Sequence, residues 1–177
     1  MVLNPPRELM LLRHAKSSWT KSCDDFDRNI TEKGKSAAEQ IGLWLKSHQL
    51  PDYIICSPAR RTRETAEIVC HQLGISTANI RLEPQLYEAD LADILSIIAS
   101  CPPNSRRVLL VGHNPSIETL THHLVTKQIT HGLHNGNLAL PATLIRIAID
   151  NRWEQILPHT SELISITHGK LLLDSKA

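Results

Sequence analysis

The sequence lacks a surplus of charge of either sign. Its 177 residues contain 19 lysines and arginines against 18 aspartates and glutamates, which gives a formal net charge of +1. A balanced charge creates no extended field that would attract nucleic acid or an anionic membrane surface. We therefore expect no nucleic acid and no membrane as a partner, and any anion site must be local.

Long apolar runs and export signals are also missing. The apolar runs are short, as at Val108 to Val111, far below the ~20 residues that cross a bilayer. The segment from Met1 to Arg7 has no charged start followed by an apolar stretch, so it does not resemble a signal peptide. These absences predict a cytoplasmic protein.

Paired cysteine spacing is absent as well, so we expect free thiols in a reducing compartment. One cysteine nevertheless has a spacing typical of an enzyme, because Cys101 and Arg107 form the Cys-x5-Arg pattern of cysteine-dependent phosphatases. That chemistry needs free backbone amides in a loop that leads into a helix. Pro102 and Pro103 remove two amides, and the loop leads into a predicted strand. A cysteine nucleophile is therefore disfavoured.

Strand and helix patterns alternate along the chain, with no repeat or linker. Buried strands are predicted at 8–13, 52–56, 108–111 and 142–149, with a further one near 81–86. Helices are predicted after Thr31, at 90–99, and from the cap-and-proline starts Ser57-Pro58 and Asn114-Pro115. The segment 131–140 is expected to be a loop, whose position relative to the site the sequence leaves open, and the last fifteen residues show no clear pattern.

This order predicts an α/β fold in three layers, α/β/α, with a mainly parallel sheet and helices on both faces. The hydrophobic fraction of 41% can build a core without disulfides or metals. A chain of this length fits one domain, which we expect to span residues 1–177.

Basic side chains follow three of the predicted strands. The first strand ends in Arg13-His14, the second leads into a helix with Arg60, Arg61 and Arg63, and the third ends in Gly112-His113. The carboxyl ends of parallel strands meet at one edge of a sheet, where ligands bind. Helix N-termini add free amides and a positive dipole end. This edge is suited to a phosphate-sized anion.

Three motifs resemble those of the histidine phosphatase superfamily, in the same order. Arg13 to Trp19 resembles its Arg-His-Gly signature, Ser57 to Ala66 resembles its Ser-x-x-x-Arg-x-x-x-Thr-Ala motif, and Leu110 to Pro115 resembles the segment around its second histidine. The Arg-His-Ala form, followed by Asp24 to Arg28 and Ile30 to Gly34, is more similar to SixA-type phosphohistidine phosphatases. An Asp27-Arg28 ion pair could brace the loop between these segments. The resemblance implies a phosphoglycerate mutase-like fold.

The resemblance also implies roles for single residues. His14 matches the nucleophile, and His113 matches the second histidine of the pocket. Arg13 and Arg61 match the two phosphate-binding arginines, and Arg61 is chosen over Arg60 because it lies four residues after Ser57 and four before Thr65. Ser17, in the first motif, is a further candidate phosphate ligand. No metal and no cofactor are expected.

Side-chain chemistry agrees with these roles. A neutral imidazole, with a reference pKa of about 6.5, is a competent nucleophile near neutral pH. Arginine forks bind phosphate oxygens in pairs and remain charged. We expect attack by His14 on the phosphoryl group, followed by hydrolysis of phospho-His14, without a metal.

The sequence identifies the general acid less clearly than it identifies the four pocket residues. Leu86-Tyr87-Glu88 resembles the segment that carries the acid of mutase-like members, which makes Glu88 the candidate and Asp90 the reserve. The alternative, that Glu88 is a surface acid in a loop, stays open. A phosphohistidine is a better leaving group than an alcohol, so a strong acid is not required.

Departures from the motifs bear on the substrate. Ala15 replaces the glycine of the first motif, Thr20 stands where mutase-like members carry an asparagine, and the chain is short for an inserted cap. A small, open site favours a phosphorylated protein, with phosphohistidine first. The alternative is a phosphatase or mutase acting on a small phosphorylated metabolite.

Two other classes of function fit the sequence less well. A metal-binding protein is suggested by five histidines between positions 113 and 134, but their spacing is poor for zinc. A non-catalytic phosphate-binding module is disfavoured because all four pocket residues are present.

Overall fold

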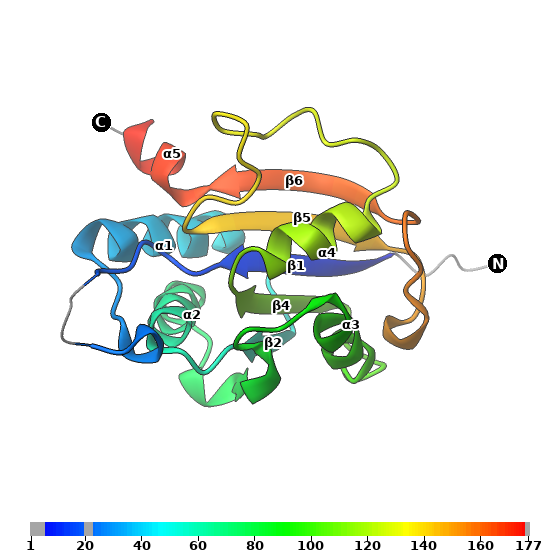
Figure 1. Cartoon of the computed structure of the whole chain (residues 1–177), viewed down its shortest axis with the longest axis horizontal. Helices are drawn as coiled ribbons and strands as arrows, with labels where there is room; N and C mark the ends of the chain where they lie inside the picture. The colour runs from blue at the N-terminus through cyan, green and yellow to red at the C-terminus, as the bar shows by residue number, and fades with distance from the viewer. Residues whose placement is uncertain (1–5, 20–22, 176–177) are drawn as a thin grey trace.

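A six-stranded sheet forms the centre of the molecule. The computed structural model describes residues 6–19 and 23–175, and its strands follow the order β3-β2-β4-β1-β5-β6 (Figure 1). The strands are β1 (Arg7–Arg13), β2 (Tyr53–Cys56), β3 (Ile80–Leu82), β4 (Arg107–Gly112), β5 (Thr143–Ile149) and β6 (Glu162–His168). The four neighbouring strands β3, β2, β4 and β1 run parallel to one another. Strand β5 runs antiparallel to β1, and β6 runs antiparallel to β5.

Helices cover both faces of this sheet, which confirms the predicted three-layer α/β fold. The described helices are α1 (Glu32–Lys46), α2 (Arg60–Leu73), α3 (Leu91–Ala99), α4 (Ser116–Leu124) and α5 (Gly169–Asp174). Alternate residues of β1 serve opposite faces, as strand geometry requires. Leu9 and Leu11 pack in one core with side chains from α3 and α4, whereas Met10 and Leu12 pack in another with side chains from α1 and α2.

Two predicted helix starts are placed differently by the structure. Helix α2 begins at Arg60 and not at Ser57-Pro58, and α4 begins at Ser116, after Asn114-Pro115. The reason at α2 is that the Ser57 hydroxyl hydrogen-bonds His113, so it does not cap the helix. The predicted cap at Thr31 is confirmed, since its side chain accepts from the Gly34 N–H.

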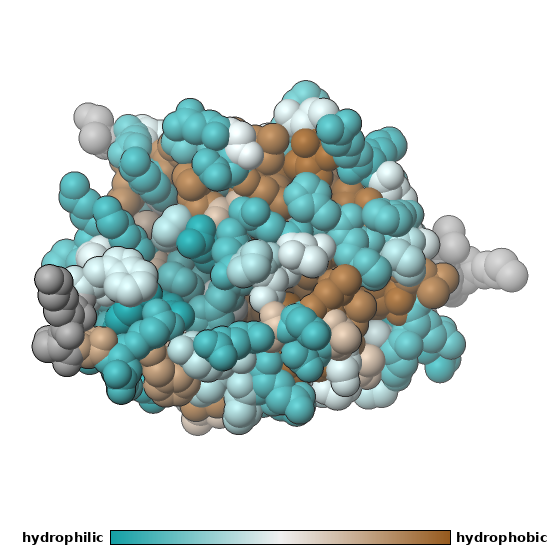
Figure 2. All heavy atoms as spheres, in the orientation of Figure 1, coloured by the Kyte–Doolittle hydropathy of each residue, from teal (hydrophilic) through white to brown (hydrophobic). Residues whose placement is uncertain are grey.

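The later part of the chain also departs from the sequence pattern. Strand β3 ends at Leu82, and Pro84–Leu86 forms a short 3-10 helix. The loop at 131–140 is confirmed, and the C-terminal residues form β6 and α5. Figure 2 shows that hydrophilic residues cover much of the face seen in Figure 1, with hydrophobic areas near its upper edge.

The described helices do not include one that is long and apolar enough to cross a membrane. All four cysteines are free thiols. Cys101 is buried, and burial raises the pKa of its thiol to about 12. A thiol that stays protonated at neutral pH is a poor nucleophile, so the structure also disfavours the cysteine-phosphatase alternative.

A buried ion pair joins β1 to β5. Glu8 accepts from Arg146 Nε, both side chains are buried, and the Arg146 guanidinium lies 5.3 Å from the Trp44 ring centroid. We expect Glu8→Ala to lower the free energy of unfolding by ~3–5 kcal/mol, because it leaves an unpaired buried charge. Urea denaturation measures this change. Glu32→Ala, which breaks the exposed pair with Lys35, is the control and should cost ~1 kcal/mol or less.

Candidate active site

The register of β1 and β4 brings the two predicted histidines together. Arg13 pairs with Gly112 across these parallel strands, so His14 and His113 follow neighbouring strand ends. The His14 N–H donates to the Gly112 carbonyl at 3.0 Å, and the two imidazole centroids lie 5.4 Å apart. Two residues about a hundred positions apart in the sequence thus form one site.

The His14 imidazole is held neutral. Its Nδ1 lies 2.8 Å from the Ala15 carbonyl oxygen; because a carbonyl only accepts, Nδ1 carries the proton and Nε2 keeps its lone pair. Burial lowers the pKa of His14 to about 4, and the nearby charges of Arg61 and Arg13 lower it further against the opposing effect of the Ala15 hydrogen bond. At neutral pH Nε2 is therefore a free nucleophilic nitrogen.

This protonation state can be measured directly. We expect the His14 ring resonances in an NMR titration to stay constant from pH 8 to about pH 5 and to move only near pH 4, because the lowered pKa delays protonation. His14→Ala assigns the resonances. The same titration in denaturant should show an ordinary histidine near pH 6.5. A midpoint near 6.5 in the folded protein would contradict the assigned environment.

His113 is fixed by a residue of the second motif. Its Nε2 lies 2.8 Å from the Ser57 hydroxyl, whereas its buried Nδ1 has no hydrogen-bond partner among the described residues. Burial lowers the pKa of His113 to about 3, with further lowering from His14 and Arg61 that Asp25 partly opposes. His113 is neutral at physiological pH.

Arg61 enters the site from the first turn of α2. It is buried, and its two terminal nitrogens donate to the backbone carbonyl and the carboxylate of Asp25, the latter at 2.9 Å. With His113 and Tyr87 it lines a cavity of about 340 Å³. Arg60, the neighbouring arginine, is instead half-exposed and pairs with Glu64 at 2.8 Å. The structure therefore brings Arg61, rather than Arg60, to the histidines.

Thr65 explains part of the motif spacing. Its hydroxyl accepts from the Ala15 N–H at 3.0 Å and donates to the Arg61 carbonyl at 2.6 Å. It thus links the backbone that follows the nucleophile to the helix that carries Arg61. Ala15 is fully buried in this arrangement, where a larger side chain would have no room.

Arg13 connects the site to the loop at 131–140. Its Nη1 donates to the Ala139 carbonyl at 2.7 Å. The Ala139 N–H in turn donates to Glu118 at 3.0 Å, and the Asn114 amide donates to the same carboxylate at 2.8 Å. The loop at 131–140, whose position the sequence left open, therefore borders the site at Ala139.

Asp25 and Arg28 are site residues that the sequence did not identify. Arg28 pairs with Asp25 at 2.7 Å and not with Asp27, so the suggested Asp27-Arg28 pair is wrong. The Asp25 carboxylate also accepts from Arg61 and from the Tyr87 hydroxyl at 3.0 Å. Burial would raise the pKa of Asp25, but these donors lower it overall. The segment Asp24 to Arg28 belongs to the SixA-like resemblance, which was the available sequence signal.

Ser17 and the two candidate acids are also placed. The Ser17 hydroxyl accepts from Arg28 Nη2, so its role as a phosphate ligand remains a prediction. Glu88 is exposed at the rim of the cavity that contains Arg61, with a left-handed φ of 59°. Such a conformation costs a residue with a side chain roughly 1–3 kcal/mol and often marks a functional position. Asp90 caps α3 in a reciprocal capping box with Asp93, so its carboxylate already has a structural partner.

Three buried donors around the histidines have no partner among the described residues. They are Arg13 Nε, Arg61 Nε and His113 Nδ1. A buried donor without a hydrogen bond costs about 1–3 kcal/mol, and native proteins rarely keep several in one place. Their grouping beside the free His14 Nε2 is the arrangement that an anionic, tetrahedral ligand would satisfy.

Two further predictions concern other parts of the chain. In the described residues, no group of three or more histidine, cysteine, aspartate or glutamate side chains is placed to hold a metal ion. Thr20 and the segment 1–5 lie outside the residues that the structure describes.

Comparisons with known proteins agree with the geometry. The family profile of the histidine phosphatase superfamily (branch 1) matches residues 9–97, about half of the chain. An uncharacterized chloroplastic protein of Arabidopsis thaliana is 33% identical over 159 residues, which are 84% of this chain and 70% of that protein.

Solved structures share the whole fold. A candidate phosphohistidine phosphatase SixA from Nakamurella multipartitia superposes with a TM-score of 0.78 at 30% identity, over 93% of this chain and 98% of that one. A second candidate SixA, from Agrobacterium tumefaciens, gives a TM-score of 0.76 at 27% identity over 92% and 98% of the two chains. The fold, the family profile and the relative at 33% identity agree, and the chain belongs to the histidine phosphatase superfamily, branch 1.

Proposed function

We propose that this phosphatase hydrolyses phosphohistidine on a protein, through a covalent phosphoenzyme formed at His14. The observation that supports this most is the free His14 Nε2 beside three unpaired buried donors. Those donors, on Arg13, Arg61 and His113, would bind the oxygens of the phosphoryl group and stabilise the charge that shifts among them during transfer.

His113 has a defined part in this binding. If the Ser57 hydroxyl donates to Nε2, the His113 proton lies on Nδ1, which is the buried nitrogen without a partner. Nδ1–H can then donate to a phosphoryl oxygen. A neutral His113 contributes a directed hydrogen bond without needing to be protonated.

The reaction takes two displacements. In the first, the lone pair of His14 Nε2 forms a bond to phosphorus and the phosphorus–nitrogen bond of the substrate breaks. The substrate imidazole keeps the electron pair and takes up a proton from Glu88, the proposed donor, or from water. The His14 Nδ1–H bond to Ala15 supports the positive ring of the phosphoenzyme. In the second, water adds to phosphorus, the bond to Nε2 breaks, and phosphate leaves with neutral His14 restored.

The choice of a protein substrate rests on two further points. Two solved structures that match this chain at 30% and 27% identity are candidate SixA phosphohistidine phosphatases, and each match covers 98% of that chain. The cavity that Arg61 and His113 line, which we call the catalytic cavity, is also small, about 340 Å³, with exposed Glu88 at its rim. It accommodates a phosphoryl group and the ring that carries it, and leaves the remainder of a large substrate outside. The cytoplasm predicted from the sequence is the compartment in which we propose it acts.

The test is phosphate release from a protein phosphorylated on histidine with phosphoramidate, compared with a panel of small phosphate esters. We expect kcat/KM for the phosphoprotein to exceed that for the esters. Release from a metabolite-like ester with no release from the phosphoprotein would replace this proposal by the small-metabolite alternative. Formation of a positional isomer in place of phosphate would indicate a mutase.

Glu88 can be tested with the same substrates. We propose it as the proton donor to the leaving group, and expect Glu88→Gln to slow hydrolysis of an alkyl phosphate ester by ~10²-fold, because a poor alkoxide leaving group needs a proton. Phosphohistidine hydrolysis should change only severalfold, since imidazole leaves more easily. Equal effects on both substrates, or none, would contradict this role. Glu83→Gln, at the start of the neighbouring 3-10 helix, is the control.

A further inference from the structure

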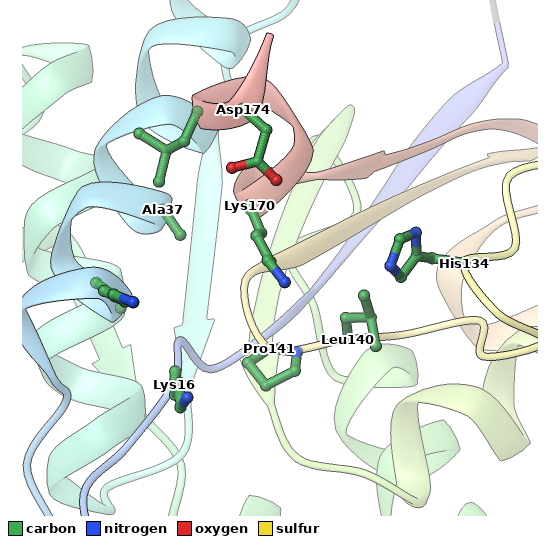
Figure 3. A pocket seen from close by; sticks show the side chains of 10 residues that line it. Lys16, Ala37, His134, Leu140, Pro141, Lys170 and Asp174 are labelled. Carbon is green, nitrogen blue, oxygen red and sulfur yellow. The ribbon is translucent and has the colours of Figure 1, made fainter. Parts of the chain in front are cut away.

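A second, larger cavity lies on the other side of the nucleophile strand end. Its volume is about 640 Å³, nearly twice that of the catalytic cavity. Its walls come from the start of α1, from α5, from Lys16 and from the loop that precedes β5. Figure 3 shows Lys170 and His134 directed toward the space above Leu140 and Pro141.

The charged side chains that line this cavity are mostly positive. Lys16, Lys33 and Lys170 line it, and within the described part of the chain none of the three makes an ion pair. Asp174 is the acid in the lining. By comparison, Lys35 on the same helix pairs with Glu32 at 2.7 Å. Three unpaired ammonium groups around one concave space in a chain of net charge +1 make it complementary to an anion.

The floor of the cavity is apolar. Leu140, Pro141, Ala37 and Leu173 contribute to the lining beneath the lysines. A bare phosphate would leave these surfaces in contact with water. A ligand that combines a carboxylate with an apolar side chain would instead use both the charge and the floor.

This cavity is joined to the catalytic residues through the backbone on both sides. Lys16 follows His14 by two residues, and its carbonyl accepts from the Thr31 N–H at 2.8 Å. A Cβ at Gly34 would stand 2.4 Å from the same oxygen, so α1 packs directly on this backbone. On the opposite wall, Leu140 and Pro141 lie between Ala139, which accepts from Arg13, and Ala142, whose N–H donates to the His14 carbonyl at 3.1 Å.

We propose that this cavity binds an acidic segment of the phosphoprotein substrate, adjacent to its phosphohistidine. A carboxylate of that segment meets Lys16, Lys33 and Lys170, and a neighbouring apolar side chain rests on Leu140 and Pro141. This inference rests on the proposed function. It adds that the enzyme selects its substrates by acidic residues near the phosphorylated histidine. Since these lysines lie outside the catalytic cavity, they affect binding of the substrate and not the chemical step.

The experiment compares three substrates: a phosphohistidine peptide flanked by glutamates, the same peptide with glutamines, and p-nitrophenyl phosphate. We expect the wild-type enzyme to prefer the acidic peptide about tenfold in kcat/KM, or ~1.4 kcal/mol. Lys33→Glu should remove that preference mainly through KM, and leave p-nitrophenyl phosphate within about twofold. An acid is favourable in the first turn of α1, so this variant should fold. Lys46→Glu, the same change at the last turn of α1, is the control.

Failure of the acidic-segment inference and failure of the proposed function give different results in this experiment. Equal turnover of the two peptides, unchanged by Lys33→Glu, would overturn the acidic-segment inference and leave the proposed function intact. Slower turnover of all three substrates by Lys33→Glu would place this lysine in the chemistry and also overturn it. Turnover of p-nitrophenyl phosphate with neither peptide hydrolysed would reject the proposed function, and the inference with it.

Discussion

His14→Ala is expected to lower phosphate release by ~10⁴-fold or more, because the variant has no nitrogen to form the phosphoenzyme. The effect should appear in kcat, since Arg13, Arg61 and His113 still bind phosphate. Brief incubation with ³²P-labelled substrate, followed by alkaline denaturation, should leave label on the wild-type chain and none on the variant.

His122→Ala is the matched control, because His122 is exposed on α4 and lies outside the cavity. It should retain full activity and labelling. A His14→Ala enzyme with wild-type turnover would disprove the proposed nucleophile. If His14→Ala were inactive but the wild type could not be labelled, direct attack by water would replace the two-step mechanism.

Arg61→Lys is expected to reduce kcat/KM by ~10²–10³-fold although it preserves the charge. The Arg61 guanidinium binds Asp25 through both terminal nitrogens and still has its buried Nε available. A single lysine ammonium cannot hold Asp25 and a phosphoryl oxygen in the same geometry. Loss of one preorganised donor at an oxyanion typically costs this much.

Arg60→Lys is the control for the second arginine, because it makes the same change one residue earlier, on the exposed side of α2. It keeps the ion pair with Glu64 within reach and should leave activity within about twofold. A larger loss from Arg60→Lys than from Arg61→Lys would show that the motif had been aligned on the wrong arginine. Thermal unfolding of both variants separates a catalytic effect from a loss of stability.

Much of the fold was predictable because its signals are local. The buried strand at 8–13, the cap at Thr31 and the helix at 90–99 each depend on a few consecutive residues. The four pocket residues were named from the resemblance to the histidine phosphatase motifs, and the structure places them together. The start of α2 could not be predicted, because the partner of Ser57 is His113, 56 residues away.

Other features of the site depend on burial and pairing that no short pattern contains. The pairing of Arg28 with Asp25, and of Asp25 with Arg61, follows from how the loop folds back over α2. The reference pKa of histidine says nothing of the value near 4 at His14, which comes from its surroundings in the folded chain. The large lysine-lined cavity joins residues 16, 33 and 170, a combination visible only in three dimensions.

The pairing of Arg13 with Gly112 has a consequence for how this enzyme can change. His14 and His113 owe their separation to the central strands, so neither can shift without disturbing the sheet. The groups around them, including Glu88, Lys33 and Lys170, sit on loops and helix ends that the sheet does not constrain. Substitutions in these surrounding segments can therefore change substrate preference, while the two histidines keep their positions as long as the sheet is kept.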